Sequence, residues 1–75
     1  MPRYRYEQVA DDLRSRIGPG KEFPPGAKLP TRRELCDRYG VSEFVADRVF
    51  WLLQRDGLTE SLPGVGVYVV DEPPA

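Results

Sequence analysis

The sequence contains no histidine and a single cysteine, Cys36, among its 75 residues. One cysteine cannot form an internal disulfide, and a zinc site needs several histidine or cysteine ligands. Cys36 falls on the apolar side of a predicted helix, so we expect a buried, inert thiol; a redox or metal role is the alternative. The sequence therefore predicts no metal and no other cofactor.

Long apolar runs are also missing. No segment approaches the ~20 consecutive apolar residues of a membrane span, and the N-terminus shows no signal-peptide pattern. We therefore expect a cytoplasmic protein that makes no membrane contact. We do not expect an enzyme either, because the sequence offers no plausible nucleophile–base pair and its carboxylates are spread along solvated helix faces.

The third feature that the sequence lacks is a surplus of positive charge. Eleven lysines and arginines face 12 aspartates and glutamates, which gives a formal charge of −1 and a pI near 5.3. Nucleic-acid-binding domains usually show a basic surplus, often with a pI above about 9. A chain of this size forms one domain, with a net stability of roughly 3–5 kcal/mol. We place this domain at residues 1–70 and expect residues 71–75 to form a disordered acidic tail.

The segment from residue 29 to residue 58, LPTRRELCDRYGVSEFVADRVFWLLQRDGL, predicts two helices joined by a tight turn. Thr31 and Glu34 have the spacing of a capping box, which predicts that the first of these helices begins at Arg32. Leucine, cysteine and tyrosine side chains then give this helix an apolar stripe.

The turn between the two helices has its own signals. Gly40 is placed to end the first helix in a left-handed conformation, Val41 is the expected buried turn residue, and Ser42 can cap the next helix. That helix should run from residue 43 to about 56, with Gly57 as its stop. A short helix, a tight turn and a longer helix form a helix-turn-helix.

The remaining elements flank this unit. Residues 6–17 carry apolar side chains at helical spacing and predict an amphipathic first helix. Residues 23–30 are rich in proline, so we expect a loop without regular structure there. Residues 58–62 and 67–70 predict two strands around a Gly64-x-Gly66 turn. The expected fold is mostly α with a small β-hairpin: a winged helix-turn-helix.

The longer helix has two faces. Its core face contains Val45, Ala46, Val49, Phe50, Leu52 and Leu53. Its outer face contains Glu43, Phe44, Asp47, Arg48, Trp51, Gln54 and Arg55. Phe44 and Trp51 lie two turns apart on the outer face, and two aligned exposed aromatic side chains suggest a contact patch.

The phrases LPTRREL, YGVS and RDGL, followed by the Gly-x-Gly hairpin, resemble the winged-helix domain of the GntR family of bacterial transcription regulators. The similarity extends from Tyr6 to Val70. It implies double-stranded DNA as the partner. Members of that family usually form dimers through a large ligand-binding domain, which this sequence does not contain. We therefore expect a standalone DNA-binding domain that acts as a homodimer or with a partner protein.

The resemblance also implies which residues meet DNA. It places them in the second helix, at the start of the third helix and at the wing tip. The candidates are Thr31, Arg32, Arg33, Ser42, Glu43, Phe44, Asp47, Arg48, Gly64, Val65 and Gly66.

Several of these candidates depart from the family pattern. Glu43 and Asp47 stand where arginines are expected, Phe44 replaces a threonine, and Val65 replaces the wing arginine; Arg48 could compensate. Losing two arginine–guanine contacts removes about 2–6 kcal/mol of binding free energy. Specific DNA binding typically exceeds non-specific binding by about 4–10 kcal/mol, so much of that difference could be lost. The acidic residues can instead accept hydrogen bonds from cytosine, and a phenylalanine can contact the thymine methyl group.

Structural interpretations compete with these roles. Glu43 could simply stabilise the helix dipole, and Asp47 could be a solvated partner of Arg48. Arg32 and Arg33 could be plain surface charge, although the resemblance places Arg33 at a family contact position. Trp51 could fold against the wing or the first helix.

We weigh two functions. The preferred one is a sequence-specific DNA-binding transcriptional regulator, on the strength of the fold-level resemblance. The alternative is a repurposed winged helix that binds a protein through Phe44, Asp47 and Trp51. The changed contact positions and the absence of surplus positive charge motivate this alternative.

Overall fold

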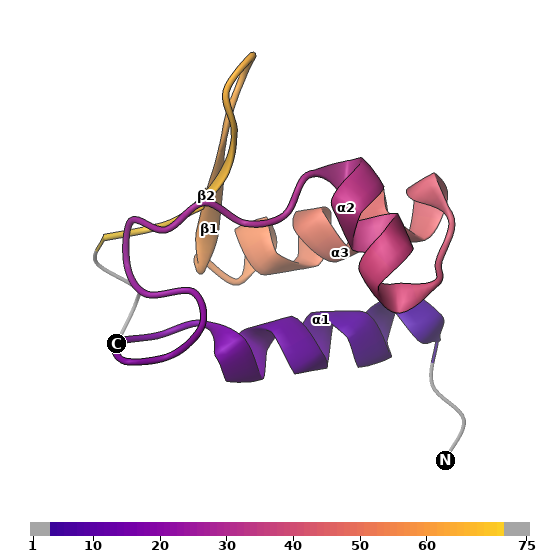
Figure 1. Cartoon of the computed structure of the whole chain (residues 1–75), viewed down its shortest axis with the longest axis horizontal. Coiled ribbons are helices and arrows are strands. Elements are labelled where there is room, and N and C mark those ends of the chain that lie inside the picture. The colour runs from indigo at the N-terminus through magenta and orange to yellow at the C-terminus, as the bar shows by residue number, and fades with distance from the viewer. Residues whose placement is uncertain (1–3, 72–75) are drawn as a thin grey trace.

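The computed structural model describes residues 4–71 and forms three helices followed by a two-stranded hairpin (Figure 1). The elements are α1 (Arg5–Arg16), α2 (Arg32–Tyr39), α3 (Glu43–Arg55), β1 (Thr59–Leu62) and β2 (Gly66–Val69). This order confirms the predicted winged helix-turn-helix, with the hairpin as its wing. Residues 72–75 of the expected acidic tail lie outside the described part of the chain.

Local capping fixes how α2 leads into α3. The Thr31 hydroxyl accepts a hydrogen bond from the Glu34 amide at 3.2 Å, and the Glu34 carboxylate accepts one from the Thr31 amide at 3.0 Å. Gly40 adopts φ +65°, which ends α2 in the left-handed region. The Ser42 hydroxyl then accepts from the Val45 amide at 3.3 Å. All three predicted signals are confirmed, and together they set the direction in which α3 leaves the turn.

One apolar core joins the three helices to the base of the wing. Fully burying one leucine or valine contributes roughly 1.5–3 kcal/mol, so this cluster supplies most of the driving force for folding. Its buried members are Val9, Ala10, Leu13, Ile17, Phe23, Leu29, Leu35, Ala46, Val49, Leu52, Leu53 and Val69.

Four residues that the sequence assigned to the core or to a buried position are only half-buried. Cys36, Val41, Val45 and Phe50 pack against the margin of the core. All four lie on or beside the helix-turn-helix, where a domain this small has too little chain to cover both sides of a helix.

The loop before α2 is more ordered than its prolines suggested. The Gly26 amide donates to the Val69 carbonyl at 3.0 Å, the Val69 amide donates to the Ala27 carbonyl at 2.8 Å, and the Leu29 amide donates to the Val67 carbonyl at 2.9 Å. As predicted, no helix or strand lies between Arg16 and Arg32, but these backbone hydrogen bonds hold the loop against β2. The prolines flank the residues that donate these bonds instead of replacing them, so β2 is paired on both edges at its base.

Candidate nucleic-acid interface

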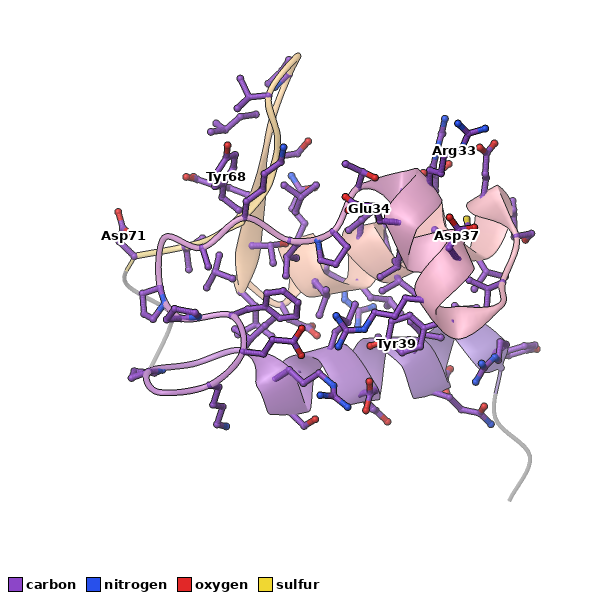
Figure 2. The ribbon with its side chains drawn as sticks, viewed as in Figure 1. Arg33, Glu34, Asp37, Tyr39, Tyr68 and Asp71 are labelled. Atoms are coloured by element: carbon purple, nitrogen blue, oxygen red, sulfur yellow. The ribbon has the colours of Figure 1, made fainter. Side chains whose placement is uncertain are left out.

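The predicted contact residues gather on exposed surface. The wing projects beyond the helices, and Arg33 points from α2 to the same side of the molecule (Figures 1 and 2). Every candidate is solvent-exposed except Gly66, which is half-buried. The fold thus leaves all the predicted positions accessible to a ligand.

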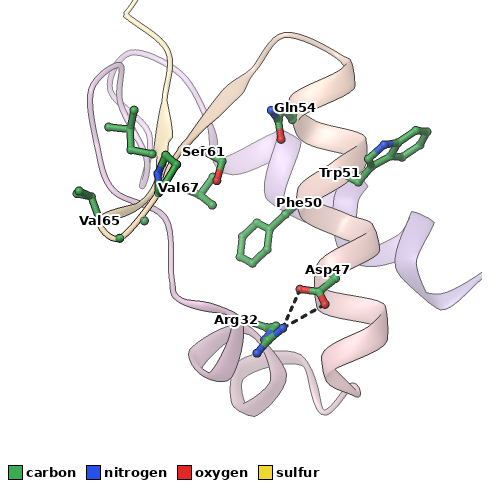
Figure 3. A pocket seen from close by; sticks show the side chains of 12 residues that line it. Arg32, Asp47, Phe50, Trp51, Gln54, Ser61, Val65 and Val67 are labelled. Carbon is green, nitrogen blue, oxygen red and sulfur yellow. Dashed lines mark hydrogen bonds and ion pairs between the residues drawn. The ribbon is translucent and has the colours of Figure 1, made fainter.

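A groove of about 690 Å³ separates α3 from the wing (Figure 3). Phe50 projects into this space from α3, and Val67 lines it from β2. Gln54 and Ser61 add hydrogen-bonding groups. The groove therefore combines an apolar lining with polar edges.

An ion pair between α2 and α3 lies at one end of this groove. Nη1 of Arg32 donates to the two carboxylate oxygens of Asp47 at 3.3 and 3.5 Å. The two side chains are 53 % and 58 % exposed, so the pair contributes at most about 1 kcal/mol to stability. The sequence suggests Arg48 as a partner of Asp47, but the partner is Arg32, because α2 packs across α3 and brings its first residue to that point.

Arg48 points elsewhere. Its guanidinium lies 4.4 Å from the centroid of the Trp51 ring and 5.5 Å from that of the Tyr6 ring on α1. Arg55 approaches the Trp51 ring as well, at 5.2 Å. Trp51 remains 47 % exposed, so it does not complete the core, and these cation–π contacts hold Arg48 towards α1.

Phe44 is the most exposed large apolar side chain of residues 4–71, at 79 %. Together with Asp47, Arg48 and Trp51 it lines a shallow hollow of about 350 Å³ on the outer face of α3. The predicted exposure of both aromatic side chains is confirmed. The first turn of α3 therefore presents an apolar ring beside the carboxylate of Glu43.

Two cations outside the lining of this groove, Arg33 and Lys28, make no side-chain hydrogen bond or ion pair within residues 4–71. Lys28 lies across the wing, since a Cβ atom built on Gly66 would stand 2.9 Å from its Cε. Hydrogen bonds with Thr31 hold the pKa of Glu34 below its usual value, and the charge of Lys28 adds to this effect.

Lys28 is not among the residues that the sequence predicts to contact DNA. Its place in a proline-rich loop gave no sign that it would reach the wing. Pairing of residues 26–29 with β2 brings it there, including the bridge between Lys28 and Tyr68. A positive charge therefore stands beside the wing although its tip carries Val65.

The wing tip is a tight turn. Gly64 adopts φ +76° and Gly66 φ +144°, a range that residues with a side chain rarely enter. The Val65 amide donates to the Leu62 carbonyl at 3.0 Å, and the Val65 side chain is exposed. The two glycines therefore shape the hairpin and allow close approach of the backbone to a ligand.

Within residues 4–71, no helix is long and apolar enough to cross a membrane. The same residues contain no cluster of three or more histidine, cysteine or acidic side chains that could hold a metal ion.

Residues 5–69 match the sequence pattern described as "Bacterial regulatory proteins, gntR family". The Exu regulon transcriptional regulator of Escherichia coli (strain K12) is 37 % identical over 73 residues, which are 97 % of this chain and 28 % of that protein. The mannosyl-D-glycerate transport/metabolism system repressor MngR of the same strain is 37 % identical over 67 residues, or 89 % and 28 %. The chain thus spans little more than a quarter of these relatives.

The fold is similar to that of solved DNA-binding domains. A crystal structure of AraR(DBD) in complex with operator ORR3 superposes with a TM-score of 0.85 at 31 % identity, covering 93 % of this chain and 83 % of that one. These relatives are transcriptional regulators, and their descriptions give no support to the alternative of a protein-interaction module.

Proposed function

Since this chain belongs to the GntR family of bacterial regulatory proteins, we propose that it binds double-stranded DNA as a sequence-specific transcriptional regulator and is not an enzyme. In this proposal α3 enters the major groove, the start of α2 meets the phosphates, and the wing lies along the adjacent backbone. The similarity to a domain crystallised on its operator supports this docking, and the cytoplasm is the expected location.

The main support for DNA binding is the exposed outer face of α3. Its residues are exposed along the whole helix, from Glu43 to Arg55. Arg32 of α2 reaches Asp47 and Tyr6 of α1 lies beside Arg48, yet both Asp47 and Arg48 stay exposed. The major groove is about 12 Å wide and accepts a helix of this kind. Arg33 and the wing flank that helix, as phosphate contacts on either side of a groove require.

We assign different roles to the two kinds of residue on this surface. The capped helix starts at Thr31 and Ser42, together with Arg33 and Lys28, suit phosphate oxygens. Phe44 suits the methyl group of thymine, because it is apolar and almost fully exposed at the start of α3.

The acidic residues shape affinity as well as specificity. Glu43 in the first turn of α3 can accept a hydrogen bond from a cytosine amino group, but it also repels phosphate. With few free cations, one copy of the domain should bind DNA weakly. We therefore expect two copies, or one copy and a partner protein, on two half-sites about one helical turn apart.

Selection from a random duplex library, followed by titration of the selected duplex at several salt concentrations, tests the proposal. We expect the logarithm of the binding constant to fall linearly with the logarithm of salt, with a slope of about −0.9 for each phosphate contact. Poly-anionic heparin serves as a control for charge without sequence. A protein that retards no duplex at about 50 mM salt would contradict the proposal.

A further inference from the structure

An arginine from α2 reaches the outer face of α3. Arg32 is the first residue of α2, and its guanidinium meets Asp47 at the end of the groove between α3 and the wing (Figure 3). We propose that Arg32 determines specificity by reading a guanine in the major groove, and that Asp47 is the residue that positions it. This inference rests on the proposed function and names one base that the surface selects.

The guanidinium keeps the donors that this task needs. Nη1 alone makes both contacts with Asp47, at 3.3 and 3.5 Å. Within residues 4–71, Nε and Nη2 of Arg32 make no hydrogen bond, and the side chain is 53 % exposed. Arginine recognises guanine by directing two N–H groups at O6 and N7. The edge formed by Nε and Nη2 can do this while Nη1 stays on Asp47.

Asp47 supplies what a lone surface arginine lacks. A long, exposed side chain loses conformational freedom when it binds, and holding it beforehand reduces that loss. Asp47 stands on α3 itself, so it holds the guanidinium at the helix that enters the groove. The pair is exposed and weak, which lets the guanidinium adjust to a base without breaking a buried contact.

The other cations of this surface are less suited to reading a base. The Arg48 guanidinium lies over the Trp51 and Tyr6 rings, towards α1. Arg33 has no partner within residues 4–71 to fix its direction, which suits a phosphate better than a base. Arg32 therefore combines position, free donors and an anchor.

The test compares the wild-type chain with Arg32→Gln, Arg32→Ala, Asp47→Ala and the double alanine variant. Each is selected on a random duplex library and then titrated with duplexes that differ at single base pairs. The wild-type chain should prefer guanine at one position by roughly 5- to 150-fold, the range of a bidentate arginine–guanine contact. Arg32→Gln should lose this preference or shift it to adenine, which glutamine recognises.

Asp47→Ala should weaken the same preference without moving it to another position. In the Arg32→Ala background, Asp47→Ala should change nothing further at that base pair, since Asp47 acts through Arg32. Arg38→Gln is the matched control, because Arg38 also lies on α2 in an ion pair but contacts Glu22 on the opposite side. Thermal melting confirms that each variant is folded.

Three results would overturn the inference while leaving the proposed function intact. One is equal loss of affinity for all sequences in Arg32→Gln with a smaller salt slope, which would make Arg32 a phosphate contact. Another is loss of a cytosine preference in Asp47→Ala, which would make Asp47 itself the reader. The third is an equal gain of affinity for all sequences in Asp47→Ala, which would mean that Asp47 weakens DNA binding by keeping Arg32 away from the DNA. Absence of any DNA binding by the wild-type chain would overturn both.

Discussion

The charged residues of this domain behave differently on its two sides. On the side where α1 meets α2, Tyr39 donates to Asp12 at 2.6 Å, and Arg38 donates to both carboxylate oxygens of Glu22 at 2.8 Å. Arg16 joins the two groups, reaching Asp12 at 3.1 Å and Glu22 at 3.3 Å. We call these five residues the back network.

On the side of α3 and the wing, charges are held loosely or not at all. Arg32 meets Asp47 with one nitrogen, Arg48 rests on aromatic rings, and Arg33 has no partner within residues 4–71. The difference separates two uses of charge. The back network joins elements that are distant in sequence, whereas the outer surface keeps donors and acceptors available for a ligand.

The largest expected effect is on DNA binding by Arg33→Ala. Loss of one charge-assisted phosphate contact should weaken binding about 10- to 100-fold and reduce the salt slope by about 1 per copy. The free energy of unfolding should change by less than about 0.5 kcal/mol, because Arg33 is exposed. Arg38→Ala is the control: it should lower the free energy of unfolding and leave DNA affinity unchanged. Comparable loss of stability in both variants would remove the distinction between the two sides.

Next in size is the effect of Gly66→Ala on the wing. The φ of +144° should cost roughly 1–3 kcal/mol of unfolding free energy, measured by urea denaturation, because residues with a side chain rarely adopt it; Lys28 Cε, 2.9 Å from an added Cβ, ends a flexible side chain and can move aside. Gly64→Ala is the matched variant: its φ of +76° is also unfavourable, but nothing stands within 4 Å. We expect Gly64→Ala to cost less, because a φ of +76° lies close to the left-handed region that other residues can enter, whereas +144° does not; the reverse order would contradict this account of the turn.

A smaller effect is expected from Tyr39→Phe in the back network. Removing the hydroxyl that donates to Asp12 should reduce the free energy of unfolding by roughly 1 kcal/mol, since the bond ends on a carboxylate but is only partly buried. DNA affinity should not change. Tyr68→Phe is the control, because the Tyr68 hydroxyl makes no hydrogen bond within residues 4–71. Equal melting temperatures for the two variants would contradict this prediction.

The smallest effect is the pH dependence of stability. Hydrogen bonds from Tyr39 and Arg16 hold the pKa of Asp12 below its ordinary 3.8. The stability that this supplies is present above pH 3.8 and is lost as the pH falls further. Burial and the bond to Asp12 raise the pKa of Tyr39 from 10.0 to about 12, so its contribution is complete below pH 10 and is lost between pH 10 and 12.

Tyr39→Phe provides the check on both ends of this profile. In the variant, the alkaline loss should be reduced and the acid loss should be shallower, as measured by urea denaturation from about pH 2 to about pH 12. An unchanged alkaline profile would mean that Tyr39 does not titrate with folding.

The local pattern was sufficient to predict much of the fold. Thr31, Gly40 and Ser42 act within one turn of chain, so their effect could be predicted from sequence spacing alone. The outer face of α3 followed from helical periodicity, and Phe44 and Trp51 are exposed there as predicted. What failed were predictions of long-range partners, such as Asp47 with Arg48 in place of Arg32.

The sequence by itself determined where α2 begins and ends, where α3 begins and which side of α3 faces outwards, because caps and periodicity act over a few residues. Only the tertiary structure decided which cations stand at that surface. It brings Arg32 from α2 to Asp47 and Lys28 from the loop to the wing, and it turns Arg48 towards α1. The reason is that an ion pair between helices depends on how they cross, and crossing is set by the whole core.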